Sequence, residues 1–133
     1  LYSFVRSIIM NLLENLDIQT QSVTANKCVI TVKVSDKLKQ PYGIVHGGIN
    51  AMLAETAASL GANQWLADRQ QDQIALGVNI TTEHLIAVSN GELRAIATPI
   101  KCGRRIQTWQ VDIHCNDQCT STSIVTLINQ PHP

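Results

Sequence analysis

Glu55 is the only charged side chain between Lys39 and Asp68, if histidine is counted as neutral. It lies within roughly residues 46–66, a stretch whose Ala, Leu and Met content favours an α-helix. Apolar or small residues occupy nearly every side of this helix, which predicts that it is buried. A carboxylate removed from water is costly unless it is paired, hydrogen-bonded or protonated. Glu55 is therefore a candidate for acid–base or nucleophilic chemistry, and a structural Glu that reaches solvent or a neighbouring strand is the alternative interpretation.

His46, Gly47 and Gly48 stand where the same helix is expected to begin. The first backbone N–H groups of a helix have no partner within it, and glycines let a ligand approach them closely. Such donors suit a carbonyl oxygen that becomes negatively charged during a reaction. The motif alone is a weak signal, because glycines also mark ordinary loop-to-helix junctions.

The spacing between these two features has a structural consequence. Glu55 follows His46 by nine residues, which is about 13 Å along one helix at 1.5 Å per residue. A single carbonyl group cannot readily meet both. We therefore expect a site between subunits, in which the helix start of one copy faces the glutamate of another.

Composition excludes several classes of protein. The 133 residues fit one domain, and ten Lys+Arg balance ten Asp+Glu. No basic excess is available for a phosphate backbone, so nucleic acid is not an expected partner. No apolar run approaches the ~18–20 residues of a membrane span. Only 15% of the residues are charged, and this neutral surface favours association with further copies of the chain.

The cysteines do not form a recognisable metal-binding pattern. No Cys-x-x-Cys pair occurs, and His114 beside Cys115 lacks a regular set of further ligands. We expect thiols in a reducing cytosol, with no metal and no cofactor. The four cysteines are Cys28, Cys102, Cys115 and Cys119.

The expected order of elements is an α+β fold, with one long buried helix wrapped by an antiparallel five- to six-stranded sheet. Residues 1–20 are predicted to form an N-terminal amphipathic helix, and Met10 is a candidate initiator, with residues 1–9 as an extension before it. A strand follows from Cys28, and the long helix comes next. Turn residues in SNGE, KCGR and CNDQ separate the last strands, which are expected to pair as hairpins. These last strands are predicted at 74–88, 92–101, 105–115 and 119–129, within a single domain over 1–133.

Residues 40–59, QPYGIVHGGINAMLAETAAS, resemble the hotdog-fold acyl-CoA thioesterases. The branch with a glutamate in its central helix is most similar, and it includes phenylacetate-pathway, 4-hydroxybenzoyl-CoA and 1,4-dihydroxy-2-naphthoyl-CoA thioesterases. The resemblance continues through TEHLIA and PIKCGRRIQTW and covers roughly 25–129. It implies a cytoplasmic enzyme that hydrolyses an acyl- or aroyl-CoA to the free acid and coenzyme A. A hotdog-fold dehydratase and a non-catalytic acyl-CoA-binding module are the alternatives.

The resemblance also implies roles for individual residues. Glu55 would be the nucleophile or the general base, and the Gly47 N–H would hold the thioester oxygen. Gln40 and His46 would position the carbonyl, the water or the leaving thiolate. Ser59, one turn after Glu55, would assist near the thiol. In the family these residues act across a subunit interface, so we expect a homo-oligomer, either a dimer or a dimer of dimers (a homotetramer).

Two further segments are expected to border coenzyme A. Lys101, Arg104 and Arg105 lie within five positions of one another and match a hairpin that receives phosphates in the family. Ile86 stands where the family often has Arg, which removes one usual nucleotide contact. The residues expected to contact substrate or coenzyme A are Gly48, Gly77, His84, Leu85, Ile86, Ala87, Lys101, Cys102, Gly103, Arg104, Arg105 and Ile106.

Overall fold

The structure is a computed structural model that describes residues 11–133. One long helix and six strands form most of it. In chain order the elements are α2 (Leu12–Asn15), β1 (Gln19–Val23), β2 (Cys28–Lys33), the 3₁₀ turn η1 (Asp36–Leu38), α3 (Gly47–Asp68), β3 (Gln73–His84), β4 (Glu92–Cys102), β5 (Ile106–Cys115) and β6 (Gln118–Pro131).

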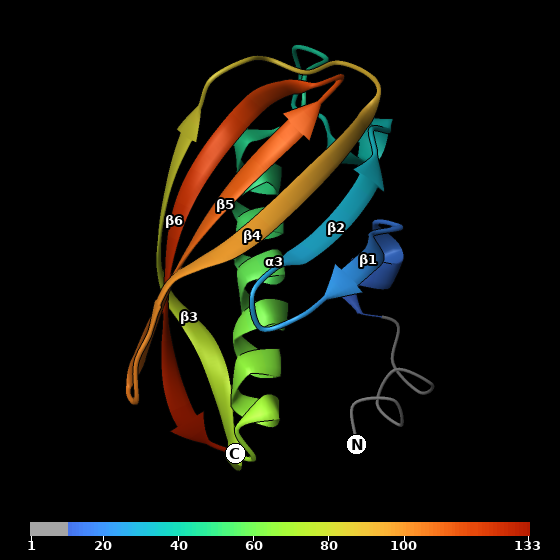
Figure 1. The fold of residues 1–133 in the computed structure, drawn as a ribbon. Coiled ribbons are helices and arrows are strands. Elements are labelled where there is room, and N and C mark those ends of the chain that lie inside the picture. Colours follow the sequence, from blue (N-terminus) through green and yellow to red (C-terminus); the bar gives the residue numbers. More distant parts are fainter. Residues whose placement is uncertain (1–10) are drawn as a thin grey trace.

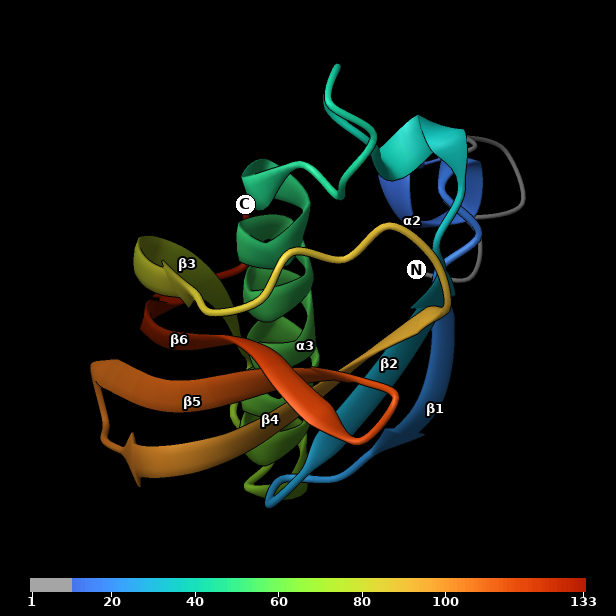
Figure 2. The same ribbon diagram turned by 90° about the horizontal axis from the view of Figure 1, so that it is seen from above.

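The six strands form one antiparallel sheet in the order β1-β2-β4-β5-β6-β3. Figure 1 shows this sheet curving around α3, and Figure 2 shows β3 and β6 on one flank of α3 with β1 and β2 on the other. The predicted α+β architecture, a long central helix wrapped by an antiparallel sheet, is confirmed.

One expected hairpin is wrong. The turn at SNGE does not pair the strands on either side of it, because β3 pairs with β6 at one edge and β4 pairs with β2 and β5. Residues 85–91 instead cross past the start of α3 (Figure 1), where Val45 N donates to Val88 O at 2.8 Å. Alternation of apolar residues predicts a strand but not its neighbour, so this crossover has no signal in the pattern. The hairpins β4–β5 and β5–β6 do form.

The N-terminal region also differs from the expectation. Within the described residues helix covers only Leu12–Asn15, capped by the Asn11 side chain, which accepts from Glu14 N at 3.2 Å. Asp17 takes a positive φ of 58°, and β1 then begins at Gln19. The helix predicted over 1–20 is therefore wrong from Leu16 onward, where Thr and Val favour a strand. Residues 1–10, including Met10, lie outside the described part.

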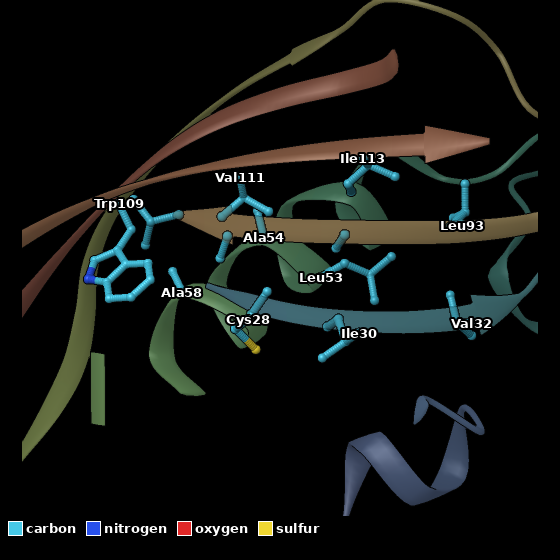
Figure 3. Close-up of a cluster of buried hydrophobic side chains, with 14 of the residues drawn as sticks. Cys28, Ile30, Val32, Leu53, Ala54, Ala58, Leu93, Trp109, Val111 and Ile113 are labelled. Carbon is cyan, nitrogen blue, oxygen red and sulfur yellow. The ribbon is translucent and has the colours of Figure 1, made fainter. Parts of the chain in front are cut away.

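One side of α3 faces the sheet and the opposite side does not. Half of the buried residues of α3 are alanines, and Ala54 and Ala58 lie against Trp109 and Val111 of β5 (Figure 3). Small side chains let the helix approach the sheet closely, and most of the large core residues are on the strands. Glu55 is half-buried on the other side, so the helix is not buried all round within one chain. The half-buried residues of that side include Met52, Glu55, Thr56, Ser59 and Leu60.

No helix among the described residues is both long and apolar enough to cross a membrane.

Candidate active site

The start of α3 is fixed by the side chain of His46. His46 has an extended backbone at the N-cap position, and its Nδ1 accepts from Gly48 N at 2.8 Å. Its own N–H donates to Leu38 O at 2.8 Å, which ties the helix start to η1. Because Nδ1 is an acceptor, the proton of the neutral ring lies on Nε2. The Gly47 N–H is not used by this cap and remains available to a ligand.

His84, the last residue of β3, lies against Gly47. A Cβ added at Gly47 would be 2.8 Å from His84 Nε2 and 3.0 Å from its Cε1, so glycine is required for this contact. On the other side of the ring, Nδ1 is 3.1 Å from Nδ2 of Asn50, a buried residue one turn into α3. His84 is thus held between two positions of one helix turn.

A pocket of about 360 Å³ opens beside these residues. The loop before α3, the first turn of α3 and the crossover after β3 all contribute to it. The Gln40 side chain belongs to its rim, and its Oε1 accepts from Tyr42 N within the same loop. The pocket is lined by Gln40, Ile44, Val45, Gly47, Asn50, His84, Leu85, Ile86, Ala87 and Val88. Six of the expected site residues therefore share one pocket.

Glu55 lies elsewhere, against Gly77 of β3. A Cβ at Gly77 would collide with the Glu55 carboxylate, so only glycine leaves space for it. A β-bulge falls between Gly77 and Asn79, at the same place in the strand. Within residues 11–133 no side chain or backbone group forms a hydrogen bond or ion pair with the Glu55 carboxylate. Ser59 is half-buried one turn further along α3.

The Asn63 side chain connects the middle of α3 to β3 through hydrogen bonds. Its Oδ1 accepts from Ala75 N at 2.9 Å, and its Nδ2 donates to Ala75 O at 3.2 Å and to Ser59 O at 2.8 Å. Ala75 precedes Gly77 by two residues. The Asn63 side-chain amide therefore fixes where Gly77 lies along α3 relative to Glu55. The contact also satisfies backbone groups of a strand that lies at the edge of the sheet.

The two parts of the expected catalytic set do not meet within one chain. Gly47 and Glu55 are eight residues apart on the continuous helix α3, about 12 Å along its axis. Glu55 does not line the pocket beside Gly47. This agrees with the spacing argument made from the sequence.

The basic hairpin is near the other end of α3 from the pocket at Gly47. Cys102, Gly103 and Arg104 line a separate pocket of about 250 Å³ together with Trp65 and Arg69. Figure 1 places this hairpin, between β4 and β5, far from the crossover 85–91. The two segments expected to border coenzyme A are therefore not brought together in one chain.

Buried amides hold the backbone of that hairpin. Asn129 Nδ2 donates to Gly103 O and Arg104 O, both at 3.1 Å, and Asn129 N donates to Arg105 O at 2.8 Å. Its Oδ1 accepts from the fully buried Gln107. The side chains of Lys101, Arg104 and Arg105 remain exposed, as a phosphate-binding surface requires.

Cysteine chemistry is not favoured in this structure. Cys28 and Cys115 are buried, and Cys102 and Cys119 are half-buried. Burial raises the pKa of the Cys28 thiol to about 11, so it carries no thiolate at neutral pH. Burial also raises the pKa of Cys102, although nearby Arg69 acts in the opposite direction.

Asn50 and Asn63 are site residues that the sequence analysis missed. Both are amides on a helix that is largely apolar, and a buried amide needs a hydrogen-bond partner. The same argument that singled out Glu55 could therefore have found them. The identity of their partners, on β3, could not have been found that way.

Comparisons with known proteins agree on one family. A family model described as Thioesterase superfamily matches residues 42–121. The 1,4-dihydroxy-2-naphthoyl-CoA hydrolase of Listeria monocytogenes is 35% identical over 118 residues, covering 84% of this chain and 94% of the relative. The proofreading thioesterase EntH of Cronobacter turicensis is 31% identical, covering 88% and 85%. Among solved structures, the thioesterase HI1161 of Haemophilus influenzae has a TM-score of 0.86 at 30% identity, covering 98% of this chain and 90% of that chain.

Proposed function

Because this chain belongs to the Thioesterase superfamily and is a hotdog-fold hydrolase of acyl-CoA thioesters, we propose that Glu55 is the group that drives the hydrolysis. Glu55 acts either as the nucleophile or as the general base that takes a proton from water. The observation that carries this assignment is the Glu55 carboxylate, which is half-buried and has no partner among residues 11–133. It lies against Gly77, where a larger residue would take its space.

The reaction adds the oxygen of water to the thioester carbonyl carbon and breaks the C–S bond. Negative charge develops on the carbonyl oxygen, and the Gly47 N–H at the start of α3 stabilises it. Coenzyme A leaves as a thiolate that takes up a proton. The Glu55 carboxylate and the Gly47 N–H suffice for this chemistry, so the proposed reaction uses no metal and no cofactor.

Three polar residues assist in this proposal. Gln40, at the pocket rim, orients the thioester carbonyl or the attacking water. His46 keeps the helix start in shape, because its Nδ1 accepts from Gly48 N, and its Nε2–H is the group proposed to assist the leaving thiolate. Ser59 lies one turn after Glu55, where its hydroxyl reaches the thiol side.

The complete site forms between two copies of the chain. Strand β3 is an edge of the sheet and pairs on one side only, with β6. Leu76 and Val78, on this strand, are 46% and 60% exposed. Antiparallel pairing of two copies along β3 covers these residues and sets the half-buried sides of two α3 helices together. Glu55 of one copy then works with Gln40, His46 and Gly47 of the other.

A second contact makes a dimer of dimers. The outer face of the sheet, opposite α3, carries exposed Ile106 in one register row with Ile128 and Leu76, and exposed Ile124 in the row of Thr81 and Gln110. Apolar side chains on that face are the kind that a further copy covers. We assign the enzyme to the cytoplasm, since all four of its cysteines are free thiols.

The test is turnover of a panel of coenzyme A thioesters, with benzoyl, naphthoyl, phenylacetyl and linear acyl groups, followed by release of the thiol. Glu55→Gln is expected to lower kcat by about 10³-fold or more on every substrate that the wild type hydrolyses. Its free energy of unfolding should not fall, because the carboxylate has no partner to lose. Near-wild-type rates for Glu55→Gln would refute the role of this residue.

The exposed hairpin is proposed to bind phosphates of coenzyme A through Lys101, Arg104 and Arg105. Arg105→Ala should raise KM for an acyl-CoA and leave KM unchanged for the matching N-acetylcysteamine thioester, which has no phosphates. An equal rise for both thioesters would contradict phosphate binding at this residue.

A further inference from the structure

The orientation of the His84 imidazole is fixed by Asn50. Asn50 is 8% exposed, and its Nδ2 is 3.1 Å from His84 Nδ1. An amide nitrogen donates and does not accept, so Nδ1 must be the acceptor in this contact. The proton of the neutral ring then lies on Nε2, at the edge of the ring that faces Gly47.

The second observation is the closeness of this Nε2 to the backbone donor of Gly47. The Cβ position of Gly47 is 2.8 Å from His84 Nε2. In standard backbone geometry that position is about 2.5 Å from the residue's own nitrogen. The two nitrogens are therefore no more than about 5.3 Å apart. One oxygen atom at a normal hydrogen-bond distance of about 2.9 Å from each fits between them.

The third observation is that both groups border the same pocket. Among residues 11–133, no acceptor is bonded to His84 Nε2, so its N–H is available to a ligand. Val45, Leu85 and Val88 line the pocket beside the ring.

We propose that His84 is a second donor to the thioester carbonyl oxygen, acting through Nε2–H beside the Gly47 N–H, and that Asn50 is its positioning residue. This proposal rests on the proposed role of the Gly47 N–H. It differs from the role that the family resemblance implies for His84, which is a contact with the pantetheine arm or nucleotide. The oxygen is held from two directions, by a backbone group and by a ring whose orientation Asn50 fixes.

The main test compares His84→Phe with His84→Gln on an acyl-CoA and on the matching N-acetylcysteamine thioester. Phenylalanine keeps the ring volume and removes the donor, whereas glutamine restores an N–H near the position of Nε2. We expect His84→Phe to lower kcat by about 100-fold with little change in KM, by the same factor on both substrates. His84→Gln should recover at least about tenfold of this loss. His114→Phe, on the face of the sheet away from α3, is the matched control and should leave kcat unchanged.

Asn50 is tested by Asn50→Leu, which has a similar volume and no donor. With Nδ1 left without a partner, the ring loses its fixed orientation, so kcat should fall by about tenfold, less than in His84→Phe. The double variant Asn50→Leu/His84→Phe should be no slower than His84→Phe alone, because Asn50 acts only through the ring. If the two losses multiply, Asn50 has a separate effect and is not a positioning residue for His84.

The outcomes separate this inference from the proposed function. If Glu55→Gln is inactive but His84→Phe retains wild-type kcat, the donor role of His84 is wrong and the role of Glu55 remains. If His84→Phe raises KM for the acyl-CoA and has no effect on the N-acetylcysteamine thioester, the ring contacts coenzyme A instead, and the inference is overturned. Melting temperatures of all variants identify any that fail to fold, and His84→Gln then decides the donor role.

Discussion

The first turn of α3 and its middle turn both lie against β3, but they do so in opposite ways. At the first turn, His46, Asn50 and His84 are joined to helix or strand by hydrogen bonds. At the middle turn, the Glu55 carboxylate lies against Gly77 with no hydrogen bond from the described residues. One region is fixed before any ligand binds, and the other presents a free ionisable group.

This difference matches what each region has to do. A donor site for a developing oxyanion is effective when its groups need no rearrangement during the reaction. A carboxylate that must attack, or take a proton, is more reactive when no protein donor stabilises its charge. About 12 Å of helix separates the two regions, and in the proposed mechanism a second copy of the chain unites their two functions.

The largest expected effect comes from mixing two variants that each lack one region. Glu55→Gln removes the carboxylate, and Gly47→Val places a side chain against His84 where the oxygen should bind. Each variant alone should be inactive. In a random one-to-one mixture, a site built from two chains receives both intact parts in about a quarter of cases. Thiol release should therefore rise to about a quarter of the wild-type rate, in a dimer or in a dimer of dimers.

Subunit exchange in this mixture is checked by giving the two variants different affinity tags and purifying the mixed oligomer. A mixed oligomer that remains inactive would show that each site is built within one chain, because no chain in the mixture holds both parts. The separation of the two regions along α3 would then have no role in catalysis.

Much of this arrangement can be predicted from the sequence. The helix that holds Glu55, the glycines at its start and five of the strands, β2 to β6, follow from local pattern, because propensity and alternation are properties of neighbouring residues. The nine-residue spacing of His46 and Glu55 predicts that a single chain cannot complete the site. A family resemblance adds the catalytic roles, which no pattern contains.

What could not be predicted is set by contacts between distant segments. The place of β3 beside β6 depends on how the sheet closes around α3, and the turn before β4 gives no sign of it. The contact of Asn50 with His84 joins residues 34 positions apart, and that of Glu55 with Gly77 depends on the bulge in β3. β1 was not predicted, because the predicted N-terminal helix continues past Leu16 to residue 20.

Gly77→Ala tests whether the activity of Glu55 depends on the space that Gly77 leaves for its carboxylate. The new Cβ takes the position of the Glu55 carboxylate, which must turn away because it is the flexible end of its side chain. A displacement of about 1 Å at a reacting group costs about 100-fold, so we expect kcat to fall by that order. The free energy of unfolding should change by less than about 1 kcal/mol. In the Glu55→Ala background, Gly77→Ala should have no effect on unfolding, and a large effect there would mean that Gly77 is required for another reason.

Asn63→Leu is the smallest of these changes and acts on the support of the Glu55 region alone. Leucine keeps the volume of the amide but leaves the Ala75 N–H and C=O without their side-chain partner. The free energy of unfolding in urea should fall by about 1–3 kcal/mol, the usual cost of unsatisfied buried groups.

Gln64→Leu is the matched control. Among the described residues the Gln64 side chain bonds only to Asp68, on the exposed side of α3, so its loss should change stability by less than about 0.5 kcal/mol. Because β3 near Gly77 is then less firmly held, kcat should fall as well, while KM should remain the same. Equal stability of the two variants would mean that β3 is positioned by its pairing with β6 alone. The sheet, and not the helix, would then fix where Gly77 lies along α3 relative to Glu55.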